Sequence, residues 1–190
     1  MPMKRNAVYL LSVCLLLLPL AGCKSLSHPE YELMVTLEPG VTGTPASGVH
    51  TYIDLEEVAY KYTPVNSQHT VEVMIDDEHE DAESTLIIYH DTVLVARLFD
   101  ARGSWKVTAI DDANSSSVEF TITFSGSDIL GGTFSDSRGY HGTWDGIDGT
   151  FNFRYSDFEA FAYTGTCHDM SGTYANGSAT GTWSATKVGE

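Results

Sequence analysis

Positive charges and helical periodicity are both scarce in this sequence. Ten Lys and Arg residues stand against 26 Asp and Glu residues, and the formal net charge at pH 7 is −16. Such a surface repels phosphate backbones and anionic lipid headgroups, which excludes nucleic-acid binding and purely electrostatic adhesion to membranes. Beyond the N-terminal segment, no stretch of a dozen residues has the apolar spacing of an amphipathic helix, which excludes a helical fold.

The motifs of the common catalytic sites are missing as well. The sequence has no Gly-x-Ser-x-Gly elbow and no phosphate-cradling glycine loop. Ser184 and Lys187 have the Ser-x-x-Lys spacing, but without the helix that such a pair needs. None of the histidines forms a His-x-His or His-Glu-x-x-His motif. The histidines are His28, His50, His69, His79, His90, His141 and His168. We expect no enzyme, no metal and no cofactor, although a site assembled from distant strands would leave no motif.

The N-terminus has the pattern of a secretory signal peptide. Lys4 and Arg5 precede an apolar run from Ala7 to Ala21, and a charged segment followed by about 7–15 apolar residues is typical of a signal peptide. Fifteen helical residues reach about 22 Å, which is short of a hydrocarbon core of about 30 Å. We therefore expect residues 1–22 to be removed rather than to form a permanent membrane span.

The apolar run ends in Leu20-Ala21-Gly22-Cys23, which resembles the bacterial lipobox. The resemblance implies that Cys23 becomes the first residue of the mature protein and that its thiol accepts a diacylglyceryl group. Acyl chains such as palmitate contribute about 0.8 kcal/mol per buried methylene, so two chains anchor a protein stably. Lys24, rather than Asp, after the cysteine implies the outer membrane of the cell envelope.

Processing leaves a more acidic chain with one unmodified cysteine. Loss of Lys4 and Arg5 takes the formal charge from −16 to −18, so the lipid has to supply the membrane anchoring. Cys14 leaves with the signal peptide and Cys23 is acylated, which excludes a disulfide within the mature chain. We expect Cys167 to be a small, buried apolar side chain.

After a polar tether at residues 23–30, the sequence predicts two all-β domains, 31–100 and 103–190. Almost every segment alternates apolar and polar residues with period two. The first domain has turn chemistry at Pro39-Gly40 and over residues 43–48. Its expected strands are Tyr31–Leu37, Val58–Tyr62, Thr70–Ile75, Ser84–Tyr89 and Thr92–Leu98.

Glycine, tyrosine and valine recur through the first domain. They stand at Gly43-Thr44-Pro45, Gly48, Tyr52, Val58, Tyr60, Tyr62 and Val71-Glu72-Val73-Met74-Ile75-Asp76. This series resembles the internalin B-repeat-like modules of bacterial surface proteins, which implies a small β-rich unit of a spacer or adhesive stalk. Members of that family have a Gly after the hairpin Asp, where this sequence has Asp77 and an acidic insertion.

The second domain repeats a Gly-Thr-aromatic unit. The copies are Gly132-Thr133-Phe134, Gly142-Thr143-Trp144, Gly149-Thr150-Phe151, Gly172-Thr173-Tyr174 and Gly181-Thr182-Trp183. Their spacings of 10, 7, 23 and 9 residues are close to one hairpin arm, except for one double interval. Eight short strands at this spacing predict an antiparallel up-and-down meander that closes into a small eight-stranded barrel. The expected strands are Trp105–Ile110, Val118–Phe124, Gly131–Phe134, Tyr140–Trp144, Thr150–Tyr155, Glu159–Tyr163, Met170–Tyr174 and Ala179–Ala185.

Each repeat unit has a structural interpretation. The glycine permits a bulge or strong coiling of the strand, and the aromatic residue is expected to fill the barrel interior. Gly103-Ser104-Trp105 and Gly181-Thr182-Trp183, on the first and last strands, resemble lipocalin- or avidin-like barrels. The aromatic residues could line a ligand cavity or a sugar-stacking face, but a small barrel is normally filled by its own side chains.

Six carboxylates crowd into residues 76–83. They belong to Asp76, Asp77, Glu78, Glu80, Asp81 and Glu83. Calcium takes several oxygen ligands, so this segment is a candidate for weak binding of a divalent cation. The segment lacks the Asp-x-Asp-x-Asp-Gly order and the distal Glu of an EF-hand loop. We expect a solvated hairpin tip without a specific metal site.

Location and composition together favour a non-catalytic binding or structural module. The lipid on Cys23 would display it in the cell envelope, at the cell surface or in the periplasm, with an envelope protein or a glycan as partner. Two alternatives stay open. One is a small-ligand or glycan carrier that uses the C-terminal barrel, and the other is an envelope enzyme with a dispersed carboxylate site.

Overall fold

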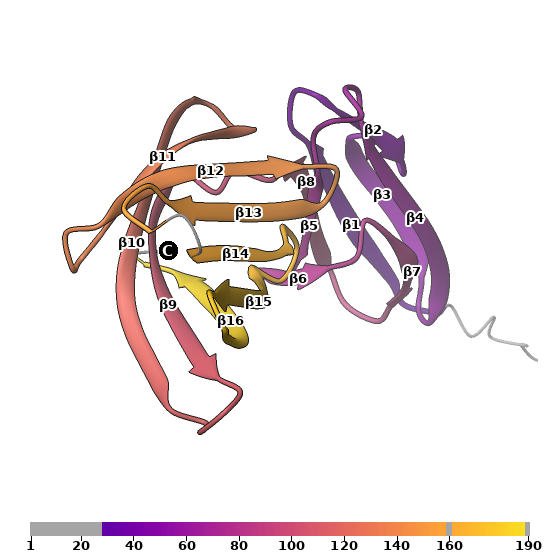
Figure 1. Ribbon diagram of the computed structural model, residues 1–190. Coiled ribbons are helices and arrows are strands. Elements are labelled where there is room, and N and C mark those ends of the chain that lie inside the picture. Colours follow the sequence, from indigo (N-terminus) through magenta and orange to yellow (C-terminus); the bar gives the residue numbers. More distant parts are fainter. Residues whose placement is uncertain (1–27, 159–160, 189–190) are drawn as a thin grey trace, which may run out of the picture.

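The computed structural model describes residues 28–158 and 161–188, and every regular element in them is a β-strand (Figure 1). The predicted all-β class is therefore confirmed. The lipobox-like segment predicted at residues 20–23 lies outside the described residues. Within those residues, no helix is long and apolar enough to span a membrane.

Two small open sheets form the N-terminal part. One has five strands in the order β3-β1-β8-β5-β6, and the other has three in the order β2-β4-β7. Strands β1 and β8 run parallel, and the other paired strands run antiparallel. The bounds are β1 (Glu30–Leu37), β2 (Val41–Thr44), β3 (Gly48–Ile53), β4 (Glu56–Pro64), β5 (Val71–Ile75), β6 (Glu78–Glu80), β7 (Glu83–Ile88) and β8 (Thr92–Leu98).

Period-two alternation decides which face of each sheet is buried. Leu33 of β1 and Leu94 of β8 have no exposed surface, and they share one core with Val58, Tyr60 and Tyr62 of β4. Successive side chains of a strand point to opposite faces, so the residues between them face away from this core. The N-terminal part is thus two sheets packed on one apolar layer.

Three strands of the N-terminal part, β2, β3 and β6, go beyond the five that the sequence predicts. All three lie at sheet edges, where a strand has one neighbour instead of two. The β5–β6 hairpin turns on Asp76 and Asp77, whose φ angles are 50° and 69°. Two central residues with positive φ suit a tight type I′ hairpin, in which Asp and Asn are the common alternatives to Gly.

The second part is a closed antiparallel barrel, as predicted. Each strand pairs with the next along the chain, and β9 closes the barrel by pairing with both β10 and β16. The predicted strand from Glu159 begins outside the described residues, and the described strand is β14. The bounds are β9 (Gly103–Asp111), β10 (Ser117–Asp128), β11 (Gly131–Asp136), β12 (His141–Ile147), β13 (Thr150–Tyr155), β14 (Phe161–Thr166), β15 (Ser171–Asn176) and β16 (Ala179–Lys187).

The Gly-Thr-aromatic units interlock across neighbouring strands. Phe134 of β11 lies opposite Gly142 of β12, and a Cβ on Gly142 would come within 2.5 Å of the Phe134 ring. Trp183 of β16 pairs with Gly172 of β15, and its ring lies 2.8 Å from where a Cβ on Gly165 of β14 would stand. Because these aromatic side chains are buried in the barrel core, the expectation that they fill the interior is confirmed, and the glycines clear the space they occupy.

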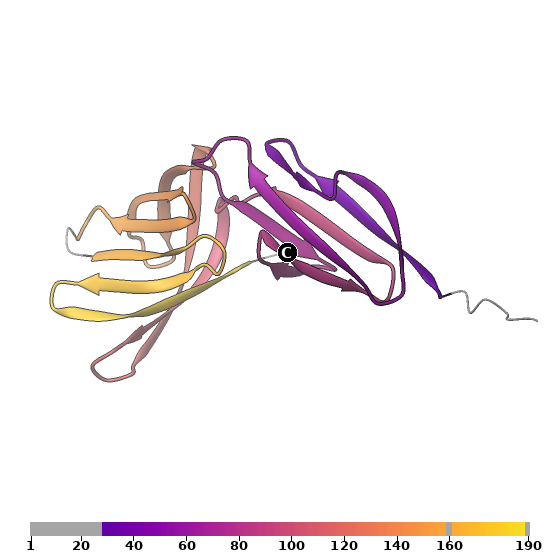
Figure 2. The ribbon, with the colours of Figure 1, turned by 90° about the vertical axis from the view of Figure 1, so that its right-hand side faces the viewer.

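One end of the barrel rests on the N-terminal part, as Figure 2 shows. The backbone N–H of Gly149, before β13, donates to the Thr70 hydroxyl at 2.9 Å, and the N–H of Asp148 donates to the Gln68 carbonyl at 3.2 Å. Phe99 belongs to the barrel core although it precedes the predicted boundary at residues 100–103. The connection between the two parts is therefore a packed segment.

Candidate functional site

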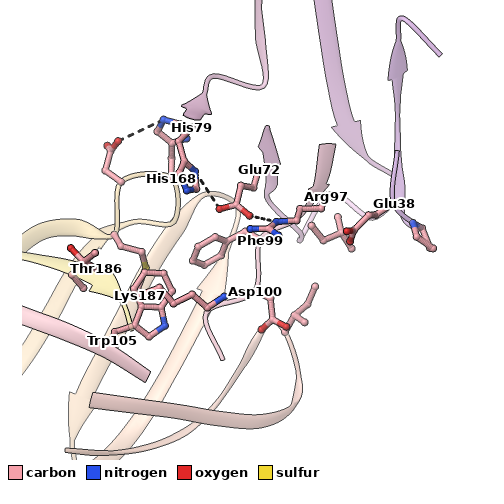
Figure 3. Close-up of a pocket in the computed structure, with 16 residues that line it drawn as sticks. Glu38, Glu72, His79, Arg97, Phe99, Asp100, Trp105, His168, Thr186 and Lys187 are labelled. Atoms are coloured by element: carbon pink, nitrogen blue, oxygen red, sulfur yellow. Dashed lines mark hydrogen bonds and ion pairs between the residues drawn. The ribbon is translucent and has the colours of Figure 1, made fainter. Parts of the chain in front are cut away.

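A cleft of about 900 Å³ lies between the N-terminal part and the near end of the barrel (Figure 3). Glu72 of β5, His79 of β6 and Arg97 of β8 come from the first part. Lys187 at the end of β16 and His168 in the turn before β15 come from the barrel. Both domains are therefore needed to form it.

The floor of the cleft is apolar. Phe99, Trp105 and Met170 line it and are themselves almost fully buried. The Trp105 indole N–H donates to the Ala101 carbonyl at 2.7 Å, which fixes the ring in one orientation. The Lys187 amine lies 5.7 Å from the centre of that ring, within the range of a cation–π contact. Nine of the sixteen residues that line the cleft are polar or charged, so it is more polar than a typical small-molecule pocket and has an apolar patch at Phe99, Trp105 and Met170.

A charged pair on the five-stranded sheet forms one wall. The Arg97 guanidinium Nε lies 2.6 Å from a carboxylate oxygen of Glu72, and His79 Nδ1 lies 3.3 Å from the other oxygen. Residues 72 and 97 are directly opposite each other in the β5–β8 pairing, which brings their side chains to the same face. Glu72 is only 12% exposed, so this pair is screened less than a surface pair.

The barrel contributes a second histidine to the same wall. The rings of His79 and His168 meet edge-on with centroids 6.4 Å apart. His168 Nε2 lies 3.6 Å from Asp169 and 3.9 Å from Asp81. Figure 3 shows both rings at one rim of the cleft, away from Trp105 and Lys187. This contact joins β6 to the turn before β15.

A second fixed charge stands in the linker at Asp100. Arg102 donates to its carboxylate from Nε at 2.9 Å and from Nη2 at 2.6 Å. Burial opposes ionisation of Asp100, but the hydrogen bonds and charge of Arg102 outweigh it and hold the pKa of the carboxyl below its usual range. Asp100 is therefore ionised and paired at neutral pH.

The predicted cation-binding residues do not converge. Asp76 and Asp77 form the hairpin turn, and the Asp76 carboxylate accepts the Val93 N–H at 2.9 Å. Glu78 and Glu80 lie on the opposite face of β6 from His79, and Glu83 pairs with Lys61 at 2.6 Å. Across the described chain, no three His, Cys, Asp or Glu side chains are placed to hold a metal ion.

Calcium is therefore expected to stabilise the protein little. A specific site occupied at 100 times its dissociation constant would add about 2.7 kcal/mol, or several degrees in melting temperature. We expect millimolar calcium to raise the melting temperature by less than this, and magnesium to do the same, because screening does not distinguish them. Thermal unfolding with each ion measures it. A calcium-specific shift that disappears on changing Asp76 and Asp77 to Asn and Glu80 to Gln would contradict this prediction.

Cys167 is placed as a structural residue. It has no exposed surface and belongs to the barrel core. Burial raises the pKa of its thiol to about 11, and a hydrogen bond with Thr70 only partly offsets this. The thiolate is the nucleophilic form, so a protonated, buried thiol does not favour covalent chemistry.

Ser184 and Lys187 lie three residues apart on β16, which sends their side chains to opposite faces. The strand therefore does not bring the two side chains of this Ser-x-x-Lys pair together.

The cleft was not predictable from local motifs. Glu72 and Arg97 stand 25 residues apart, and only the pairing of β5 with β8 brings them together. Trp105 is visible in the sequence as the start of the barrel, but its position at an interdomain floor depends on how the domains pack. The one available signal was that residues 72 and 97 are charged and stand between core positions of their strands.

No protein-family model, no curated protein and no solved structure matches this chain.

Proposed function

We propose that this protein is a lipid-anchored module of the bacterial cell envelope that binds a partner, without catalysis, in the cleft between its two β parts. The observation that carries the binding proposal is the cleft itself, which combines an apolar floor with charged walls from both parts. The lipobox around Cys23 supports the anchoring. Lys24 supports the outer membrane as the destination.

The charges of the cleft indicate which partners fit. Glu38, Glu72, Asp100 and Asp169 line it with Arg97 and Lys187, so carboxylates outnumber cations. The chain as a whole is strongly acidic. A neutral or cationic segment of an envelope protein, or a neutral glycan, therefore fits better than a polyanion.

An envelope enzyme is supported less well. Two of the four carboxylates in the cleft are engaged in ion pairs, Glu72 with Arg97 and Asp100 with Arg102. A general acid at neutral pH needs a raised pKa, whereas the pKa of Asp100 is lowered. The cleft suits recognition rather than proton transfer.

The family resemblances of the two domains suggest a role for each of them in this function. An internalin B-repeat-like first domain would act as the spacer that follows the tether, and a lipocalin- or avidin-like barrel would present the second wall of the cleft. The tether from Cys23 to Glu30 spans at most about 25 Å when extended. A partner bound in the cleft would therefore be held close to the membrane.

Site-specific photo-crosslinking in the native host tests the binding role. A photoreactive amino acid at Pro39 or Thr186, both on the cleft, is expected to give a discrete adduct on illumination. The same residue at Ala59 is the control, because Ala59 is exposed on β4 and points away from the core. Adducts at all three positions, or at none, would contradict the proposal and leave a structural spacer instead.

A further inference from the structure

The far end of the barrel carries a buried charged cluster. Strand directions alternate, so the turns after β11, β13 and β15 meet at the end opposite the N-terminal part. The Asp136 side chain there is fully buried. It accepts from Arg138 Nε at 2.9 Å, from Arg138 Nη2 at 2.7 Å and from the Tyr155 hydroxyl at 3.0 Å. The backbone N–H groups of Arg138 and Tyr140 also donate to it.

This cluster holds the Arg138 guanidinium in place. Its carbon lies 3.9 Å from the centre of the Phe120 ring, and Nη2 also donates to the Tyr155 hydroxyl at 2.8 Å. Burying an ion pair rarely stabilises a fold more than apolar packing would. An additional aromatic side chain could close this end of the barrel equally well. The charged cluster is therefore not needed for packing.

Arg138 also lines a hollow of about 110 Å³. Tyr140, Tyr155, Phe158 and Phe161 form its walls, and Asn176 adds an amide. Tyr140 and Phe158 are 38% and 46% exposed, and their rings meet edge-on at 5.1 Å. Exposed aromatic rings around fixed hydrogen-bond donors are a recognisable binding arrangement.

Size and charge restrict what this hollow can take. Its volume suits one ring-sized group, not a drug-sized molecule, which needs about 300 Å³ or more. The carboxylate of Asp136 neutralises Arg138, and the strongly negative chain disfavours anions. The guanidinium and the Asn176 amide can bond to hydroxyl oxygens, while the aromatic walls suit an apolar ring face.

We propose that this hollow binds one neutral sugar ring, such as the terminal residue of a glycan. A pyranose has C–H groups that pack on aromatic rings and hydroxyl groups that exchange hydrogen bonds with Arg138 and Asn176. The site lies at the opposite end of the barrel from the cleft, so it is independent of the partner proposed there.

Saturation-transfer NMR on the full-length protein tests this site with three soluble probes: methyl glucoside, N-acetylglucosamine and glucuronate. At least one neutral probe is expected to bind and glucuronate to bind more weakly. Phe158→Ala is expected to weaken the neutral probe about tenfold, because one aromatic contact is lost. Tyr89→Ala, which removes a 59% exposed ring from the N-terminal part, is the matched control and should leave binding unchanged.

Three outcomes would overturn the proposal. They are no transfer to either neutral sugar, equal binding by the wild type and Phe158→Ala, and tighter binding of glucuronate than of the neutral sugars. Phe158 is nearly half exposed, so its truncation should leave the barrel folded. The melting temperature of the variant verifies this, and Arg138→Lys gives a second test. Lysine retains the charge but loses the planar fork, so weaker binding by it supports the site, and unchanged binding counts against it.

Discussion

A protein with Ser in place of Cys23 is expected to carry no lipid and to retain its signal peptide. The thiol is the acceptor of the diacylglyceryl group, and in the lipoproteins that the Leu20-Ala21-Gly22-Cys23 segment resembles, acylation precedes cleavage. A hydroxyl in its place cannot form the thioether. Metabolic labelling with a fatty-acid analogue measures the lipid, and gel mobility measures the cleavage.

Cys14→Ser is the matched control for this experiment. Cys14 lies in the apolar run and not at its end, so the substitution should leave both labelling and cleavage intact. Label that persists on the Cys23→Ser protein would refute the lipid anchor, and with it the envelope location. The cleft proposal would survive that result, because it rests on residues of the folded part.

The barrel was predictable because its sequence repeats. Each Gly-Thr-aromatic unit marks a strand, and the pairing of Phe134 with Gly142 shows why glycine and ring recur together. The double interval between Gly149 and Gly172 hides β14, which carries the unit in reverse as Tyr163-Thr164-Gly165. Gly165 pairs with Phe151, but the ring that a Cβ at residue 165 would meet is that of Trp183, at 2.8 Å, so a glycine again leaves room for an aromatic ring of the core.

The edge strands of the sheets and the cleft were harder to predict, and for the same reason. An edge strand such as β6 has hydrogen bonds on one side only, and its three residues bury no side chain. The cleft likewise depends on contacts between distant segments, such as Glu72 with Arg97 and His79 with His168. Local alternation identifies a strand and its buried face, but it does not identify which exposed faces come together.

A second large effect, on stability, is expected at the segment that connects the two parts. Phe99 precedes the barrel in sequence, yet its side chain packs in the barrel core, where its ring meets Phe151 edge-on at 6.3 Å. Its backbone N–H donates to the Thr70 carbonyl at 2.9 Å, which ties it to the N-terminal part. Phe99 thus belongs to both parts at once.

Phe99→Ala is expected to lower the free energy of unfolding by about 3–5 kcal/mol, the usual cost of truncating a buried Phe. At about 2–4 °C per kcal/mol for a chain of this length, the melting temperature should fall by roughly 10 °C. Urea and thermal unfolding measure both quantities. Phe158→Ala is the matched control, since Phe158 is 46% exposed and its truncation should cost less than about 1 kcal/mol.

The same reasoning predicts where an isolated barrel must begin. The sequence places the junction near Arg102-Gly103 and predicts that 103–190 folds alone with a cooperative transition. That fragment lacks Phe99 and Ala101, which are buried in the barrel core, so a fragment 98–190 is expected to melt at a higher temperature than 103–190. Equal melting temperatures, together with a cost below about 1 kcal/mol for Phe99→Ala, would mean that the linker only connects the domains. An unfolded 103–190 beside a folded 98–190 would instead move the domain boundary to the start of the linker, because the barrel would then need Phe99 to complete its core.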